Sequence, residues 1–291
     1  MNNTPFFVAG ITGQVGGAAA RKLLKQGHQV RTLARDPQKA AEWAKQGVEV
    51  RQGDLNDPTA VAAAQEGVQG AFLLMPPHLA HSPGFPEAKA TISSYREALQ
   101  QSPPPRLVLL SSIGSEQNSG LGNITSTHLM EEALGDLPFP IAIVRAGGFI
   151  ENFKFSLPRA QSSGWLDSFW TPTDRPFPMI ATADIGNQVA DLLTNPWDGK
   201  KIVELGSPVS ADDLAHAMTE VLGRSVQARA IPREQWSAAL EAMGFSPGTT
   251  GSYEEMMDGF NSGWIHFGVH GTEPIAGTTS PAQVFAQMQK A

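Results

Sequence analysis

The feature that most constrains this chain is a set of three glycines that follows a short apolar run near its start. Residues 6–9 have the apolar character of a buried strand, Gly10, Gly13 and Gly16 follow, and an alanine-rich helical run then ends at Gly27. Glycines at this spacing let the chain turn tightly, bring backbone N–H groups against a pyrophosphate and pack the next helix closely on the strand. Because the strand and the helix are the context that the pattern requires, the stretch predicts a dinucleotide site.

Apolar runs alternate with helical patterns through the first two thirds of the chain. Strands are predicted at residues 6–9, 28–37, 48–52, 70–75, 105–114, 141–145 and 201–205. Helical runs separate most of them, and this alternation is typical of a parallel sheet. The predicted fold is α/β, a doubly wound parallel (Rossmann) sheet with helices on both faces.

The composition changes beyond Gly147, where short helices lie between Gly/Pro turns and most of the tryptophans are found. This part is predicted to be a small, mainly helical C-terminal lobe that covers the carboxyl edge of the sheet. A sheet strand falls between its pieces, so the lobe is interwoven with the core. The predicted core is residues 1–148 with 183–206, and the lobe is residues 149–182 and 207–291. Aromatic side chains there form either the core of the lobe or a substrate site.

Charge and composition exclude several classes of partner. The chain has 291 residues, a net charge of −7 and no block of Lys or Arg, which argues against nucleic acid or an anionic membrane surface. The absence of cysteine excludes disulfides, thiolate metal sites and cysteine nucleophiles, and no metal site is predicted. The apolar start lacks a basic segment and is broken by glycines, and no window reaches the length of a membrane span. A cytoplasmic protein is expected.

The second predicted strand carries two arginines, Arg31 and Arg35. An NAD-selective site places an acidic residue at the end of this strand to hold the ribose 2′-OH, whereas a 2′-phosphate needs a cationic group. Arg35 comes one residue before Asp36, and Arg31 is expected to point the same way or into solvent. NADP(H) is therefore the predicted cofactor, in preference to NAD(H). In the alternative, Arg35 is a surface residue paired with Asp36.

Polar side chains follow two further strands. Asp54 comes after the third strand, where a carboxylate can accept a hydrogen bond from an adenine amino group; Asp54 or Asp57 is also expected to cap the next helix. His78 and His81 follow the fourth strand. They either face the cofactor or substrate or are solvated on a Pro/Gly-rich loop.

Taken together, these segments resemble the NmrA-like branch of the atypical short-chain dehydrogenase/reductases. The resemblance covers residues 6–206 and, more loosely, the C-terminal segment. The segments that carry it are Gly10-Ile-Thr-Gly-Gln-Val-Gly, Leu33-Ala-Arg-Asp-Pro, Gly53-Asp-Leu-Asn-Asp-Pro, Leu110-Ser-Ser-Ile-Gly and Arg145-Ala-Gly-Gly-Phe-Ile-Glu-Asn. Members of this branch include NADPH-dependent quinone reductases, azoreductases, reductases of plant and fungal secondary metabolism, and dinucleotide-sensing regulators that catalyse nothing.

The resemblance implies roles for the matched positions. The pyrophosphate would be held by Gly10, Thr12, Gly13, Gln14 and Val15, the 2′-phosphate by Arg35, and the adenine by Asp54 and Leu55. The ribose and nicotinamide side would be lined by Leu74, Met75 and Pro76, with Ser111 and Ser112 at the end of the fifth strand. Phe149 and Asn152 would sit over the nicotinamide and the substrate. Under the lobe, the substrate would also meet some of Trp165, Trp170, Met179 and Trp264.

The chain departs from the superfamily at its catalytic pair. Standard members use Tyr-x-x-x-Lys on the helix after the fifth strand, where the phenol transfers a proton and the lysine lowers its pKa. This chain has two tyrosines, Tyr95 and Tyr253, and neither is followed four residues later by lysine. In the expected helix, Asn123 and Thr127 take the places of the pair. His128 adjoins them, and it either donates a proton, binds the ribose hydroxyls or lies on the helix surface.

Three functions are compatible with these observations. The first is an NADP(H)-dependent oxidoreductase that reduces a conjugated small molecule, such as a quinone, azo compound, imine or enone. The alternative is a non-catalytic NADP(H) sensor that regulates a protein partner, which the missing pair favours. The third is an isomerase or epimerase, which needs a base and has His128 or His78 available. A homodimer is left open.

Overall fold

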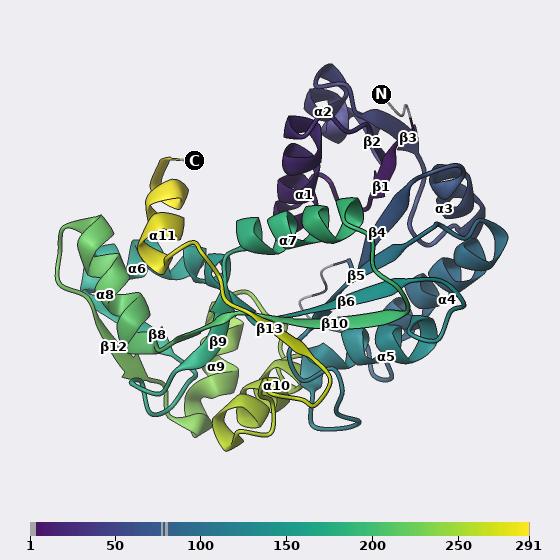
Figure 1. Ribbon diagram of the computed structural model, residues 1–291. Coiled ribbons are helices and arrows are strands. Elements are labelled where there is room, and N and C mark those ends of the chain that lie inside the picture. Colours follow the sequence, from purple (N-terminus) through teal and green to yellow (C-terminus); the bar gives the residue numbers. More distant parts are fainter. Residues whose placement is uncertain (1–3, 77, 79–80, 291) are drawn as a thin grey trace.

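A parallel eight-stranded sheet lies at the centre of the computed structural model, which describes residues 4–76, 78 and 81–290 (Figure 1). The strands pair in parallel throughout. Their order across the sheet is β13 (Glu273–Ile275), β10 (Lys200–Leu205), β6 (Ile141–Ala146), β5 (Leu107–Ser112), β4 (Gly70–Leu74), β1 (Phe6–Val8), β2 (Val30–Ala34) and β3 (Glu49–Gln52). The predicted doubly wound sheet is confirmed.

Helices cover both faces of this sheet, and alternate residues of each strand serve the two faces. Phe6 and Val8 pack with α1 (Gln14–Lys25) and α7 (Thr182–Thr194). Phe7 packs on the other face with the second set of helices. That set consists of α3 (Pro58–Gln65), α4 (Pro86–Gln101) and α5 (Thr125–Leu134). Because both faces are covered, the central strands are mostly apolar, with polar residues near the carboxyl ends of β5 and β6, which explains why their sequence runs lack alternation.

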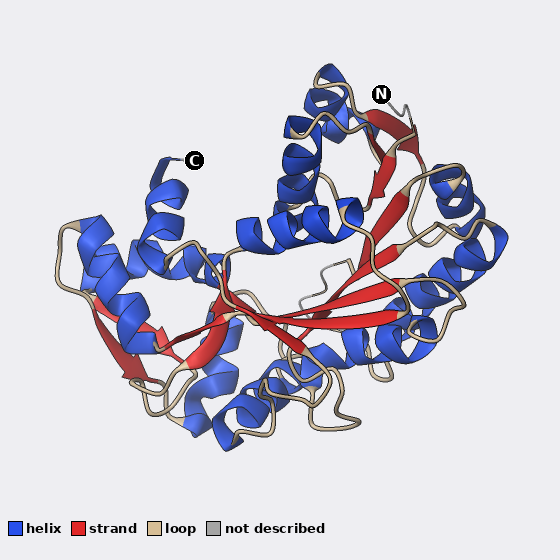
Figure 2. Ribbon diagram, in the orientation of Figure 1, coloured by secondary structure: helices blue, strands red, loops and turns tan. Residues whose placement is uncertain are grey.

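The helices that follow β7 in the chain, apart from α7, form a lobe beyond the carboxyl ends of the strands, on the left of Figure 2. Its helices are α6 (Leu157–Ser163), α8 (Ala211–Leu222), α9 (Trp236–Ala242), α10 (Gly251–Ser262) and α11 (Pro281–Lys290). Two small sheets join them: β11 (Ser207–Val209), β9 (Phe177–Ile180) and β7 (Gly148–Phe149) in one, β12 (Gln227–Ala230) and β8 (Trp165–Ser168) in the other. The short helical segments are η1 (Pro37–Ala40), α2 (Ala41–Lys45), η2 (Gly122–Ile124), η3 (Ile150–Ser156) and η4 (Arg233–Gln235).

The main sheet contains one strand that the sequence did not predict. β13 comes from the C-terminal segment assigned to the lobe, yet it pairs with β10 at the edge of the sheet. Three residues that include Pro274 carry neither the length nor the alternation of a strand signal, and an edge position tolerates the missing N–H of proline. Among the residues described, no helix has the length and the apolar character that a membrane crossing demands.

Candidate dinucleotide and substrate site

The candidate site lies where the chain order of the sheet reverses, between β1 and β4. Ligands of doubly wound sheets bind outside the carboxyl ends of the strands at this point. Gly10, just past β1, lies close to the last residue of β4: a Cβ atom on Gly10 would be 3.1 Å from a methyl carbon of Leu74. The turn after β1 and the end of β4 therefore form one local surface, as the sequence pattern requires.

The glycine turn brings the first turn of α1 close to the strand. Gly10 has a φ of +64°, and its carbonyl accepts a hydrogen bond from the Gly13 N–H at 2.9 Å. A Cβ on Gly16 would lie 2.4 Å from the same carbonyl oxygen, so only glycine allows this approach. No side chain caps α1 at Gly13, and residues 12–14 are exposed, so backbone N–H groups remain open to an anion. Val15 is buried, so only its backbone is available to a ligand.

Arg31 in β2 and Arg35 just beyond its end have different environments, and the expectation that Arg31 points toward the cofactor or into solvent is wrong. Arg31 is buried, and its guanidinium binds Glu49 and the backbone carbonyls of Ala64 and Glu66. Arg35 is exposed one residue after β2 and, in the described part of the chain, forms no hydrogen bond or ion pair. Asp36 instead caps η1 by accepting the Gln38 N–H, so the pairing of Arg35 with Asp36 is not observed.

Beyond β3, the helix cap is Asp57, which accepts the N–H groups of Thr59 and Ala60. Asp54 is half-buried and accepts the N–H of Asn56, which leaves its second carboxylate oxygen for another donor. The phenol of Tyr95 donates to the carbonyl of Leu74 at 2.8 Å. Burial raises the pKa of Tyr95, so the neutral phenol keeps this hydrogen bond and fixes the end of β4.

Helix α5 carries neither Tyr nor Lys, and its polar side chains form a local cluster with Ser115. The Thr127 hydroxyl donates to the Ile124 carbonyl, so it accepts from the Ser115 hydroxyl at 2.8 Å. The Nδ1 of half-buried His128 lies 2.9 Å from the Ser115 carbonyl oxygen. Since a carbonyl only accepts, Nδ1 carries the proton and Nε2 is the atom left for a ligand.

Ser111 and Ser112 of β5 were both predicted to line the cofactor site, and the hydroxyl of Ser111 already forms a hydrogen bond within the protein. It is buried and donates to Glu131 of α5, which also binds Arg145 of β6 through two hydrogen bonds of 3.0 and 2.7 Å. Glu131 was not found from the sequence, because nothing in the sequence of α5 marks one of its two adjacent glutamates as buried. Ser112, the last residue of β5, is half-buried and stays a prediction.

Four of the residues expected over the substrate, Phe149, Asn152, Trp165 and Trp264, lie outside the buried core of the lobe. Phe149 is half-buried in β7, and Asn152 is exposed in η3, directly after the exit of β6. Trp264 is 44% exposed, and its indole N–H donates to the Ser119 carbonyl. Trp165 lies in the outer sheet of the lobe, where the Arg229 guanidinium covers its ring.

Trp170 and Met179 belong to the core of the lobe, the alternative expected for aromatic side chains there, and their contact with a substrate stays a prediction. They are 7% and 2% exposed, and Trp170 stacks on Phe177 with ring centroids 4.8 Å apart. The loop at residues 114–124 packs closely against the lobe, because a Cβ on Gly122 would lie 1.8 Å from a backbone oxygen of α10. The loop that carries His78 and His81 includes residues 77 and 79–80, which lie outside the described part of the chain.

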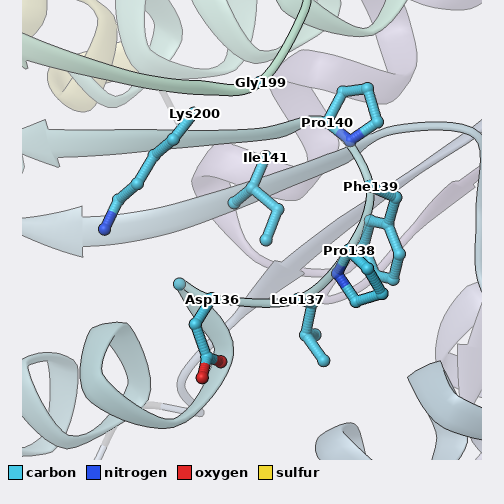
Figure 3. Close-up of a pocket in the computed structure, with 9 residues that line it drawn as sticks. Asp136, Leu137, Pro138, Phe139, Pro140, Ile141, Gly199 and Lys200 are labelled. Atoms are coloured by element: carbon cyan, nitrogen blue, oxygen red, sulfur yellow. The ribbon is translucent and has the colours of Figure 1, made fainter.

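A pocket of about 460 Å³ lies at the amino ends of the strands of the main sheet, opposite the dinucleotide site (Figure 3). It is formed by residues 135–141 together with Gly199 and Lys200, at the amino ends of β6 and β10. Since ligands of this fold bind at the carboxyl ends, this pocket is not part of the dinucleotide site. Within the described residues, no group of three or more His, Asp or Glu side chains is placed to hold a metal ion.

The comparisons with known proteins agree with this geometry. Residues 10–196 match the NAD(P)H-binding family. Quinone oxidoreductase 2 of Escherichia coli (strain K12) is 25% identical over 83% of this chain and 82% of its own length, and an NAD(P)H azoreductase of Xenophilus azovorans is 25% identical over 98% and 96%. The crystal structure of the E. coli NADPH-dependent quinone oxidoreductase QOR2 in complex with NADPH superposes with a TM-score of 0.80 at 23% identity, over 98% of this chain and 99% of that one. The chain belongs to the NAD(P)H-binding family.

Proposed function

We propose that this protein is an NADP(H)-dependent oxidoreductase that reduces a conjugated small molecule of the quinone, azo, imine or enone type. The observation that carries the proposal is the uncapped first turn of α1 beside β4, with the exposed Arg35 one residue beyond β2. The turn offers backbone donors for a pyrophosphate, and Arg35 offers a cation for a 2′-phosphate. The quinone and azo chemistry in the names of two relatives supports the class of acceptor.

Bound NADPH would supply the hydride, and the residues of the chain would orient the acceptor and provide the proton. We assign proton transfer to the imidazolium form of His128, in which the Ser115 carbonyl holds Nδ1–H and the Nε2–H would give its proton to the reduced acceptor. Phe149 and Asn152, after the exit of β6, are proposed to contact the nicotinamide and the acceptor. Neither tyrosine replaces the missing Tyr-x-x-x-Lys pair, since Tyr95 lies buried in α4 and Tyr253 lies half-buried in α10 of the lobe. Reduction of these acceptors suits such a site, because their anionic products are readily protonated.

A second candidate is an NADP(H) sensor that turns over no substrate and regulates a protein partner. The observation that favours it is the state of α5, where the Thr127 hydroxyl is engaged by Ser115 and Ile124 and only His128 can supply a proton. In this case the nucleotide would select between two conformations of the chain.

The test is a turnover assay of the purified protein with NADPH and a panel of quinones and azo dyes, followed by the loss of nicotinamide absorbance. The reductase proposal expects oxidation of NADPH that depends on both protein and acceptor. Tight binding of NADPH with no turnover across the panel would instead favour the sensor. Recovery of one stoichiometric protein partner that is released when the oxidised nucleotide replaces the reduced one would then identify the regulated protein.

A further inference from the structure

We infer that Glu116 is a positioning residue, which fixes the ring of His128 through the peptide bond between Ser115 and Glu116. The inference rests on the proposed function, since it concerns the residue to which we assign the proton. Its structural basis is the buried guanidinium of Arg145, which contacts two carboxylates, those of Glu131 and Glu116, although one would balance its charge. This guanidinium lies on the face of the sheet beneath the loop that carries Ser115.

Arg145 is the fixed point of this arrangement. Its backbone is in register with Ser111 of β5 and Glu204 of β10, so the three side chains form a row across one face of the sheet. Arg145 is 5% exposed, and Glu131 of α5 binds it through both carboxylate oxygens. One carboxylate already balances the charge of this guanidinium in a bidentate arrangement, which is the strongest form of such a pair.

Glu116 brings a second carboxylate to the same guanidinium. Its Oε2 lies 3.0 Å from Nη1 of Arg145, at an angle that does not make a hydrogen bond. Among the described residues, neither of its enclosed carboxylate oxygens has a hydrogen-bond partner. Attraction between opposite charges is therefore what holds the Glu116 side chain, and a neutral side chain of the same shape would not be held.

The anchored residue is directly joined to the contact that orients His128. The peptide unit between Ser115 and Glu116 provides the carbonyl that accepts from Nδ1 of His128 at 2.9 Å. The flanking turn is short, with hydrogen bonds from Ser115 N to the Ser112 carbonyl and from Gln117 N to the Gly114 carbonyl. Release of Glu116 removes the side-chain anchor on one side of this peptide plane. Rotation of the plane then takes from His128 the acceptor that selects its Nδ1–H tautomer.

The test uses Glu116→Gln, with Glu132→Gln as the matched control on the exposed side of α5. The fold is expected to survive, because the Glu131–Arg145 pair is untouched and the amide has the shape of the acid. The readout is the ¹⁵N spectrum of the histidine rings in the full chain, in which the signal of His128 is identified among the seven histidines by its loss in His128→Gln. The wild type and Glu132→Gln should show the Nδ1–H form, and Glu116→Gln a mixture of both tautomers.

Kinetics provide the second readout. Glu116→Gln should lower kcat by about tenfold or more, as expected for a misplaced reacting group, while KM for the acceptor and Kd for NADPH stay unchanged. An unchanged His128 spectrum in a folded Glu116→Gln protein would overturn the inference. If the tautomer changes as expected but His128→Gln keeps full turnover, the positioning stands and the proposed proton transfer fails. The two failures are therefore distinguishable.

Discussion

His128, to which we assign the proton transfer, is oriented by one hydrogen bond that an isolated sequence cannot show. The sequence placed it beside the positions of the missing pair, and the structure adds the Ser115 carbonyl that leaves only Nε2 for a ligand. Arg35 and Arg31 show the limit of such reasoning. They are four residues apart, Arg31 at the second position of β2 and Arg35 just beyond its end. Arg31 is nevertheless buried against Glu49 and two carbonyls that lie 18 to 35 residues further on. Contacts between distant segments decide which arginine is free.

Replacement of His128 by glutamine should lower kcat about 100- to 10,000-fold, the usual contribution of a general acid. Kd for NADPH should stay unchanged, because the ring is proposed to act only on the proton. Steady-state kinetics with a quinone, together with a nucleotide titration, measure both quantities. His216→Gln, on an exposed face of α8 in the lobe, is the control. Equal turnover by His128→Gln and the control would remove His128 from the mechanism.

The elements of the core could be predicted because the signal for each lies within one short stretch of sequence. Buried parallel strands are continuous apolar runs, and the glycine turn has a fixed spacing, so β1, α1 and β4 were expected close to where they lie. The short strands that follow β6, in the lobe and at the edge of the main sheet, could not be predicted in this way. β7, β9, β11 and β13 have two to four residues and contain Gly or Pro, and only pairing with distant segments makes them strands. The packing of Trp170 and Met179 in the core of the lobe could not be predicted for the same reason, since their neighbours come from several separate segments.

Gly16→Ala tests the contact between the turn and α1. The added Cβ would lie 2.4 Å from the Gly10 carbonyl oxygen, and backbone cannot move aside as a flexible side chain can. The free energy of unfolding should fall by about 1–3 kcal/mol, and NADPH binding should weaken as α1 is displaced. Urea unfolding and a nucleotide titration measure these effects. Gly251→Ala in α10, where a Cβ meets nothing within 4 Å, should leave both unchanged. Full NADPH affinity in Gly16→Ala would show that the close approach is not needed.

For the molecule as a whole, one carboxylate joins the C-terminal segment of the lobe to the core. Asp184, in the first turn of α7, accepts hydrogen bonds from the backbone N–H and hydroxyl groups of Thr278 and Thr279. Burial alone would raise the pKa of Asp184, but these hydrogen bonds to the charged form outweigh it and lower the pKa. Ionised Asp184 therefore stabilises the packing of residues 277–280 on α7.

The lowered pKa gives this stabilisation a definite pH dependence. The contribution is fully present above the pKa of the unfolded side chain, about 3.9, and is lost as the pH falls below it through the folded value. Asp184→Asn should therefore be less stable than the wild type at pH 7 and should lose less stability on acidification. Urea unfolding from pH 7 to pH 3 measures the difference, with the exposed Asp198→Asn as control. Parallel pH curves for the wild type and Asp184→Asn would contradict this account.

The central claim is that this molecule binds NADP(H) at the carboxyl edge of the sheet and that Arg35 recognises the 2′-phosphate. The most direct measurement is a calorimetric titration of the wild type and Arg35→Ala with NADPH and NADH, with Arg224→Ala in the lobe as control. The account predicts that the wild type prefers NADPH and that Arg35→Ala loses about 1.5–3 kcal/mol of binding free energy for NADPH with little change for NADH. Equal weakening of both nucleotides, or no preference in the wild type, would contradict it.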